Sequence, residues 1–256
     1  MDMLSKVGKY RFLTEPFHCD FSQRIFLSHL GNHLLNAADF HSNDRGYGMN
    51  YLNTIHHTWV LSRFVMEMQQ MPVAYDNIDV ETWVENVKRS FTSRNFAITG
   101  SDGQPLGYGR SIWAMIDTRS RQPVDILQVR DGLISSYIEE TKPCPIEPFS
   151  RFRIPADAPV MADVETHYSD VDVNGHINSV KYIEHLLNLW PIDFYREQRV
   201  RRIELAYVAE SHCGDHLLFR KAEEADGVVC VSIAKREPNS TNAIEVCKCK
   251  VVFAKD

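Results

Sequence analysis

The chain has 256 residues, 44% of them hydrophobic, and a formal net charge of −6, an ordinary globular composition for about one to two domains. A chain of this length buries roughly 70–75% of its unfolded surface, so its core needs no disulfide or metal. The acidic balance disfavours nonspecific binding to nucleic acid or anionic membranes, because both partners are polyanions. No apolar run is long enough for a membrane span.

The cysteines and the N-terminus indicate a compartment. The six cysteines are scattered without a Cys-x-x-Cys pair, so no zinc site is predicted. Residues 1–12 alternate charged and apolar side chains and lack the apolar core of a secretory signal. We therefore expect reduced thiols in a cytoplasmic protein.

The first half of the chain carries one helical pattern followed by strand patterns. Apolar residues spaced by three and four predict a helix at residues 27–40, with Ser28 as the candidate N-cap. The strands are predicted from alternating or β-branched runs at residues 58–68, 78–84, 91–98 and 108–116. Asp102-Gly103 supplies the positive φ of a tight hairpin turn.

Proline marks the middle of the chain. Six of the eleven prolines fall within residues 123–159, which is typical of a linker. We expect a first domain at residues 1–130, a Pro-rich linker at 131–160 and a second domain at 161–256.

The second half has the same order of signals. A helical pattern covers residues 178–190 and is stopped by Pro191. Asp226-Gly227 is a second tight-turn signal. The strands are predicted at residues 201–208, 216–220, 228–234 and 244–253.

An internal repeat supports a duplication. The tetrad His-Leu-Leu-Asn occurs at residues 33–36 and again at 185–188, an offset of 152, within the predicted helix of each half. One helix followed by a run of antiparallel strands is best satisfied by a sheet that wraps the helix and buries its apolar face. We predict an α+β fold in which each half is such a sheet around one central helix.

A cluster of polar residues precedes the second helix. Asp172, Asn174 and His176 are spaced by two, so an extended backbone points them in one direction. His176 lies at the positive end of the helix, where the macrodipole disfavours imidazolium, and a neutral imidazole can polarise a carbonyl or take a proton. Asn174 offers a donor to an oxyanion, and Asp172 offers a base, nucleophile or orienting group. Alternatively, Asp172 and Asn174 only cap the helix.

These residues resemble the signature of the acyl-acyl carrier protein thioesterases, a family of double hotdog enzymes. The matching string is Asp172, Asn174, His176 and Asn178. Residues 207–210 match a family Tyr-x-x-Glu element, and residues 59–63 and 111–115 resemble family strands. The resemblance covers about residues 10–253 and implies a tandem hotdog fold.

The resemblance also implies an active site, formed by Asp172, Asn174, His176 and Glu210. Glu210 would be the base for a hydrolytic water, and attack of Asp172 on the thioester carbonyl is the rival mechanism. Many plant members have cysteine after this glutamate, where the chain has Ser211. Adjacent residues on a strand point to opposite faces, so we expect Ser211 to face away from the site.

The repeat provides an internal comparison. At the offset of 152 the site maps onto Asp20, Ser22, Arg24 and Thr58, so the first half has lost the set. The resemblance assigns this half to the acyl-chain pocket. The apolar candidates for its wall are Met49, Trp59, Met66 and Met68, although Met-rich strands are also ordinary core.

The implied activity is hydrolysis of acyl-acyl carrier protein thioesters, releasing free fatty acid and ending chain elongation without metal or organic cofactor. The partner is an acidic carrier that presents the acyl chain on phosphopantetheine, so a basic docking patch is expected. Its candidates are Lys181, Arg199, Arg201 and Arg202. The alternatives are an acyl-CoA thioesterase, a noncatalytic hotdog that binds acyl thioesters, and a hotdog hydratase; a homodimer is also left open.

Overall fold

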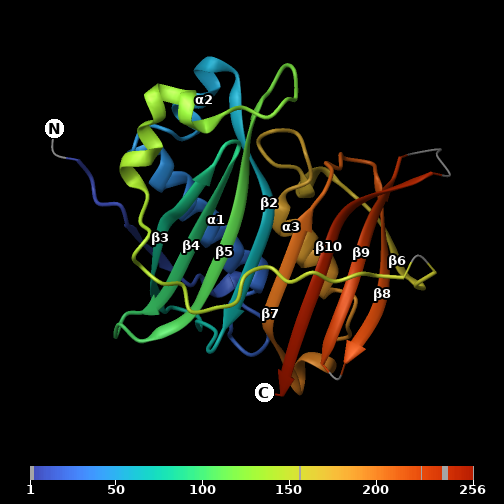
Figure 1. Ribbon diagram of the computed structural model, residues 1–256. Coiled ribbons are helices and arrows are strands. Elements are labelled where there is room, and N and C mark those ends of the chain that lie inside the picture. Colours follow the sequence, from blue (N-terminus) through green and yellow to red (C-terminus); the bar gives the residue numbers. More distant parts are fainter. Residues whose placement is uncertain (1–2, 156, 226, 238–241, 256) are drawn as a thin grey trace. The chain divides into compact units, whose positions relative to one another are not determined.

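The computed structural model describes residues 3–155, 157–225, 227–237 and 242–255 (Figure 1). The chain forms two compact units that divide between Pro148 and Phe149, inside the predicted linker. In the described ranges, no helix combines the length and apolar composition needed to cross a membrane.

The first unit is an antiparallel sheet packed on one long helix. Its strands follow the order β1-β3-β4-β5-β2, and Figure 1 shows helix α1 behind them. The strands are β1 (Gly8–Leu13), β2 (His57–Met68), β3 (Asn77–Lys88), β4 (Phe91–Gly100) and β5 (Pro105–Asp117). The helices are α1 (Leu27–Asp44), α2 (Met49–Leu52) and the 3-10 segments η1 (Pro16–His18), η2 (Asn53–Ile55) and η3 (Ile126–Tyr137).

Helix α1 packs closely on the sheet through its apolar face. Leu30, Leu34 and Ala37 are spaced by three and four and are fully buried, as an amphipathic helix requires. Gly109 of β5 permits the approach, because a Cβ there would lie 2.9 Å from the side chain of Leu34. Met66 is paired with Gly109 in the sheet register, so it also faces the helix.

The segment after η3 is not a free linker over its whole length. Arg110 of β5 donates hydrogen bonds to the carbonyls of Cys144 (2.8 Å) and Ile146 (3.0 Å), and both of these residues are buried. Lys142 forms an ion pair with Glu81 of β3 at 2.7 Å. Residues 142–146 therefore pack on the first unit.

The second unit repeats the arrangement with a shorter helix. Its sheet has the order β7-β10-β9-β8-β6, and α3 packs behind it through Val180, Ile183 and Leu186 (Figure 1). The strands are β6 (Val160–Glu165), β7 (Gln198–Tyr207), β8 (His216–Ala225), β9 (Val228–Arg236) and β10 (Ala243–Lys255). The helices are α3 (Ser179–Leu187) and the 3-10 segments η4 (Tyr168–Asp170) and η5 (Phe194–Arg196).

The predicted α+β architecture, with a sheet around one central helix in each half, is confirmed. Both predicted helices and all eight predicted strands are present, although their ends move by several residues. Gly103 and Gly227 have φ of +80° and +71°, as their turns require, while Asp226 lies outside the described residues.

Three details of the prediction were wrong. Each half begins with an edge strand, β1 or β6, and neither strand was predicted from the sequence. Ser28 is buried within the first turn of α1, so Phe26 and not Ser28 precedes the helix as its cap residue. Helix α3 ends at Leu187, with Asn188 as its C-cap residue, and the following N–H groups of Leu189 and Trp190 bond to carbonyls three residues back, before Pro191 is reached.

Candidate active site

The loop before α3 is folded by the carboxylate of Asp172. One oxygen of this carboxylate accepts hydrogen bonds from the backbone N–H groups of Asn174 (2.8 Å) and His176 (3.2 Å). The Asp172 N–H donates to the carbonyl of His176 at 2.8 Å, which closes the loop. Gly175 has φ of +82°, a conformation that favours glycine. Asp172 thus makes a compact turn that presents the side chain of His176.

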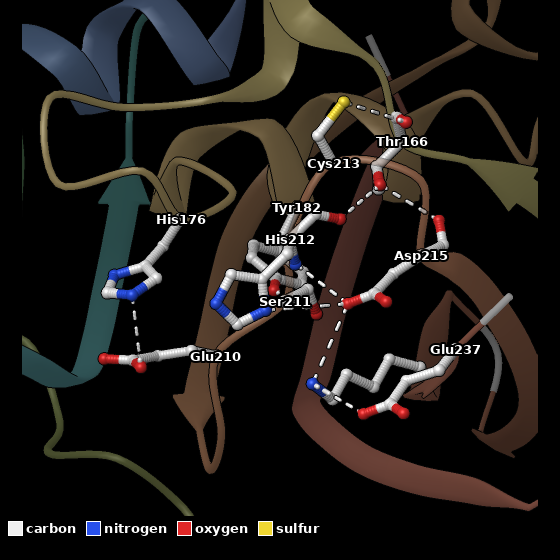
Figure 2. Close-up of polar contacts among 10 residues, drawn as sticks. Thr166, His176, Tyr182, Glu210, Ser211, His212, Cys213, Asp215 and Glu237 are labelled. Carbon is white, nitrogen blue, oxygen red and sulfur yellow. Dashed lines mark hydrogen bonds and ion pairs between the residues drawn. The ribbon is translucent and has the colours of Figure 1, made fainter.

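His176 faces Glu210, which comes from the segment after β7. The Nε2 atom of His176 lies 3.3 Å from a carboxylate oxygen of Glu210, and both side chains are about one third exposed (Figure 2). The two segments are joined where the N–H of Ile177 donates to the carbonyl of Ser211 at 2.9 Å. Since these two residues directly follow His176 and Glu210, this bond places the imidazole and the carboxylate side by side.

Asn174 has a different position from these two residues. It is exposed at the tip of the turn, beside Val173, which is 92% exposed. Its backbone N–H is used by Asp172. The backbone of Asn174 is therefore fixed in the turn two residues before His176, and its side chain is accessible.

Ser211 points away from this pair, as predicted. Its side chain is fully buried, and its hydroxyl accepts a hydrogen bond from the hydroxyl of Tyr182 in α3 at 2.9 Å (Figure 2). Burial raises the pKa of Tyr182 well above its ordinary value, so this hydroxyl stays a neutral donor. The Ser211 side chain is therefore part of the contact between α3 and the loop after β7.

A second imidazole lies at the site and is absent from the sequence motif. The ring of His212 makes an edge-to-face contact with the ring of His176, with centroids 5.2 Å apart and planes at 78°. Its position two residues after Glu210 was the available signal, but neither periodicity nor the family pattern drew attention to it. In the described part of the chain, no group of three or more His, Cys, Asp or Glu side chains is arranged to hold a metal ion.

The first unit contains the same turn without the same side chains. One carboxylate oxygen of Asp20 accepts hydrogen bonds from the N–H groups of Ser22 (2.8 Å) and Arg24 (3.2 Å). Its own N–H donates to the carbonyl of Arg24 at 2.8 Å. These bonds reproduce those of Asp172, so the predicted equivalence of the two aspartates is confirmed by their contacts.

The predicted equivalence of Glu210 and Thr58 was wrong. The N–H of Thr14 donates to the carbonyl of Asp76 (2.8 Å), as the N–H of Thr166 does to that of Asp215 (2.9 Å). Before the helix, equivalent residues of the two units are 152 positions apart, but after it they are only 139 positions apart. The difference arises because α1 and the segment that follows it are longer in the first unit. The counterpart of Glu210 is Met71, so the first unit still lacks the acid.

The candidate pocket residues have two kinds of environment. Met66 and Met68 are buried in the core of the first unit, and core packing alone accounts for them. Met49 begins α2, and Trp59 packs on a buried apolar cluster while donating from Nε1 to the carbonyl of Tyr47 at 3.1 Å. Their contribution to an acyl-chain pocket remains a prediction.

The candidate docking residues require one correction. Arg202 is only 9% exposed, and its Nε donates to the buried carboxylate of Glu204 at 2.8 Å, so it does not offer its charge to a partner. Arg201 is exposed and Arg199 is half-buried, both on β7. Lys181 of α3 forms an ion pair with Glu184 at 2.9 Å.

Comparison with solved structures places the fold in the double hotdog class. An acyl-ACP thioesterase from Bacteroides thetaiotaomicron matches with 46% identity and a TM-score of 0.89, over 97% of this chain and 98% of that chain. The 12:0-ACP thioesterase from Umbellularia californica has a similar fold, with 17% identity, a TM-score of 0.83 and full coverage of both chains.

Residues 6–134 match the acyl-ACP thioesterase N-terminal domain, and residues 155–248 match the acyl-ACP thioesterase C-terminal domain. The chain belongs to the acyl-ACP thioesterase family. A palmitoyl-acyl carrier protein thioesterase of the chloroplast of Arabidopsis thaliana is 27% identical over 160 residues, which are 61% of this chain. The match spans only 38% of that plant protein's length.

Proposed function

We propose that the protein hydrolyses acyl-acyl carrier protein thioesters and releases free fatty acid. The observation that carries this proposal is the 3.3 Å contact between His176 Nε2 and the carboxylate of Glu210. The contact joins an imidazole from the loop before α3 and a carboxylate from the segment after β7, and both side chains are accessible. Family membership and the similarity to the Bacteroides structure support the carrier-linked substrate.

In the proposed mechanism a water molecule is the nucleophile and Glu210 is its base. The carboxylate takes a proton from water as the oxygen attacks the thioester carbonyl carbon, and a C–O bond forms. His176 orients the carboxylate, takes this proton from Glu210 through Nε2 and gives it to the sulfur as the C–S bond breaks. The products are a fatty acid and the carrier thiol. We assign the exposed amide of Asn174 to the developing oxyanion.

The rival mechanism, attack by Asp172, has less support. The Asp172 carboxylate already accepts two backbone hydrogen bonds that define the loop. The same bonds occur at Asp20, in a unit that lacks both the imidazole and the acid. The first unit keeps this carboxylate although it has no other site residue. The hydrogen bonds of the turn therefore explain the carboxylate better than a catalytic role does. We therefore infer that Asp172 is a loop-forming residue.

The carrier partner requires a basic surface on an acidic protein. Arg199, Arg201 and Lys181 are the remaining candidates, since Arg202 is buried against Glu204. An acyl-CoA thioesterase is the alternative, and it would need no protein-docking surface. A cytoplasmic location, based on the N-terminal sequence, and a homodimer remain predictions, and the curated plant relatives are named as chloroplastic.

The test is a hydrolysis assay with the purified protein on a chain-length panel of acyl carrier protein and CoA thioesters. We expect release of fatty acid, with higher kcat/KM for the carrier-linked substrates. His176→Ala and Glu210→Ala should each lower kcat by about two orders of magnitude or more, as loss of acid-base or positioning groups does.

Arg24→Ala is the matched control, because Arg24 occupies the position of His176 in the first unit. It should leave the chemical step nearly unchanged. Binding of acyl thioesters without turnover would favour the noncatalytic alternative. Near-native kcat in either His176→Ala or Glu210→Ala would remove that residue from the mechanism.

A further inference from the structure

His212 lies against His176, and its Nδ1 is 4.0 Å from a carboxylate oxygen of Asp215 in its own loop. Its ring contacts the His176 ring edge to face, with centroids 5.2 Å apart, within the range in which aromatic rings attract one another in this geometry. The side chain is 56% exposed, so it contributes little to the core. Figure 2 shows it beside the His176–Glu210 pair.

The backbone of His212 is fixed on both sides. Its N–H donates to a carboxylate oxygen of Asp215 at 2.8 Å, and its carbonyl accepts a hydrogen bond from the hydroxyl of Thr166 at 2.7 Å. The same Asp215 oxygen lies 3.7 Å from the ammonium of Lys235 in β9. Ser211, the preceding residue, is buried on Tyr182. The imidazole of His212 therefore projects from a rigid support.

The orientation of the His176 imidazole can be fixed by a neighbouring ring. Its ring is about one third exposed, and rotation about χ2 of a histidine is broad and roughly two-fold. Only one of these ring orientations directs Nε2 at Glu210. A ring packed at 78° against one side of the imidazole restricts that rotation.

The first unit shows that the loop itself requires no imidazole. By the offset of 139, the counterpart of His212 is Val73. Its N–H donates to a carboxylate oxygen of Asp76 at 3.0 Å, which reproduces the bond between His212 and Asp215. The position facing it is Arg24 in place of His176, and Arg24 and Val73 form an isolated β-bridge. The second imidazole is therefore present only where the first one is.

We propose that His212 is a positioning residue, which holds the imidazole of His176 with Nε2 directed at Glu210. This role rests on the proposed hydrolysis at His176 and Glu210. His212 affects the reaction only through His176, by the contact between the two rings.

The kinetic test compares His212→Ala with His212→Phe, which keeps an aromatic ring without the nitrogens. Misplacement of a catalytic group lowers the rate of the chemical step rather than substrate binding. We expect kcat to fall about tenfold or more in His212→Ala with KM within about twofold, and His212→Phe to recover most of kcat. Val73→Ala removes the counterpart side chain in the first unit and should change neither constant.

A second readout does not depend on turnover. In protein labelled with ¹⁵N-histidine, the ring signals of His176 are assigned by their loss in His176→Ala. We expect these signals to move in His212→Ala toward those of a freely rotating histidine, and to stay near their wild-type positions in His212→Phe. If the wild-type protein hydrolyses no thioester while these shifts behave as expected, the proposed function fails and the positioning of His176 stands.

Three outcomes would overturn the proposal. A raised KM with unchanged kcat in His212→Ala would make His212 a substrate-binding residue. Equal losses in His212→Ala and His212→Phe would show that the ring contact is not what matters. His176 signals unchanged in His212→Ala would mean that His176 is oriented without it.

Discussion

At the scale of single residues, the two aspartates separate loop formation from chemistry. Asp20 and Asp172 make the same hydrogen bonds to the second and fourth residues after them. The Asp172 loop carries His176 where the Asp20 loop carries Arg24, and His176 contacts Glu210. The carboxylate is thus explained by backbone geometry, and the difference between the units lies in His176 and Glu210.

Asp172→Asn distinguishes the two mechanisms. The amide oxygen of asparagine accepts the same backbone hydrogen bonds, so the loop should persist and kcat should fall less than about tenfold, whereas Asp172→Ala should lose the loop and most of the turnover. The measurement is kcat for the best substrate of the panel, with Asp20→Asn as the matched control. A complete loss of turnover in folded Asp172→Asn would favour Asp172 as the nucleophile.

Ser211→Ala tests whether the residue after Glu210 has a chemical role. Its hydroxyl is buried on Tyr182, away from the His176–Glu210 pair, so we expect most of the wild-type kcat to remain. Loss of this one buried hydrogen bond should lower the free energy of unfolding by about 1–3 kcal/mol, measured by urea denaturation. A trapped acyl-serine on mass spectrometry, together with a loss of turnover as large as in His176→Ala, would contradict the water mechanism.

Much of the site could be predicted from sequence, because spacing by two and a strand-to-helix turn are local properties. The contact between His176 and Glu210 could be predicted only with the second motif, Tyr-x-x-Glu, because no local rule brings separate segments together. His212 was missed because its role depends on a ring contact across two loops. Arg202 was misassigned because charge alone does not reveal that Glu204 holds it in the interior.

At the scale of elements, the C-terminal end of α1 anchors the N-terminal segment of the chain. His41 is fully buried; its Nε2 donates to the carbonyl of Lys6 (3.0 Å), and its Nδ1 accepts from the hydroxyl of Tyr47 (3.1 Å). Arg45, one helical turn later, donates two hydrogen bonds to the carbonyl of Ser5. In the neutral imidazole of His41, both ring nitrogens have a hydrogen-bond partner.

This arrangement predicts a loss of stability in acid. Burial, and then the nearby Arg94 guanidinium, lower the pKa of His41 to about 2, against about 6.5 in the unfolded chain. Below pH 6.5 the unfolded state binds a proton that the folded state does not, so the free energy of unfolding falls by about 1.4 kcal/mol for each pH unit. His41→Gln should remove this contribution.

Urea denaturation of the wild-type protein and of His41→Gln at pH 7.0, 6.0 and 5.0 measures the effect. The wild-type protein should lose more stability over this range than the variant does, with His216→Gln as the control for loss of a partly exposed histidine. Parallel pH profiles for wild type and His41→Gln would contradict the assignment of the acid loss to His41.

Element boundaries differed from prediction where long-range contacts decide them. β1 and β6 are short edge strands with many polar side chains, and they form because β3 and β8 offer unpaired edges. The proline-rich segment has the composition of a linker, yet the Arg110 guanidinium holds its carbonyls on the first sheet. The central strands and both helices, whose periodicity reflects one buried face, were predicted well.

At the scale of the whole molecule, two units share one scaffold and carry different side chains on it. The turn of Asp20 and the turn of Asp172 have the same backbone hydrogen bonds, but of these two turns only that of Asp172 carries a histidine, which contacts Glu210. The proposed docking of an acidic carrier to a protein with net charge −6 requires a local basic surface. Arg199 and Arg201 of β7 are the strongest candidates, because Arg202 is excluded by its burial and Lys181 forms an ion pair with Glu184.

Charge reversal tests this docking surface. In Arg199→Glu/Arg201→Glu we expect KM for acyl-acyl carrier protein to rise about tenfold, since charges at an interface mainly change the rate of association. KM for acyl-CoA should change much less, and added salt should narrow the difference by screening the surface charges. Arg119→Glu/Arg121→Glu makes the same change of net charge at exposed arginines of the first unit and should leave the preference for the carrier intact. Equal effects of the β7 variant on both donors would show that these arginines do not recognise the carrier.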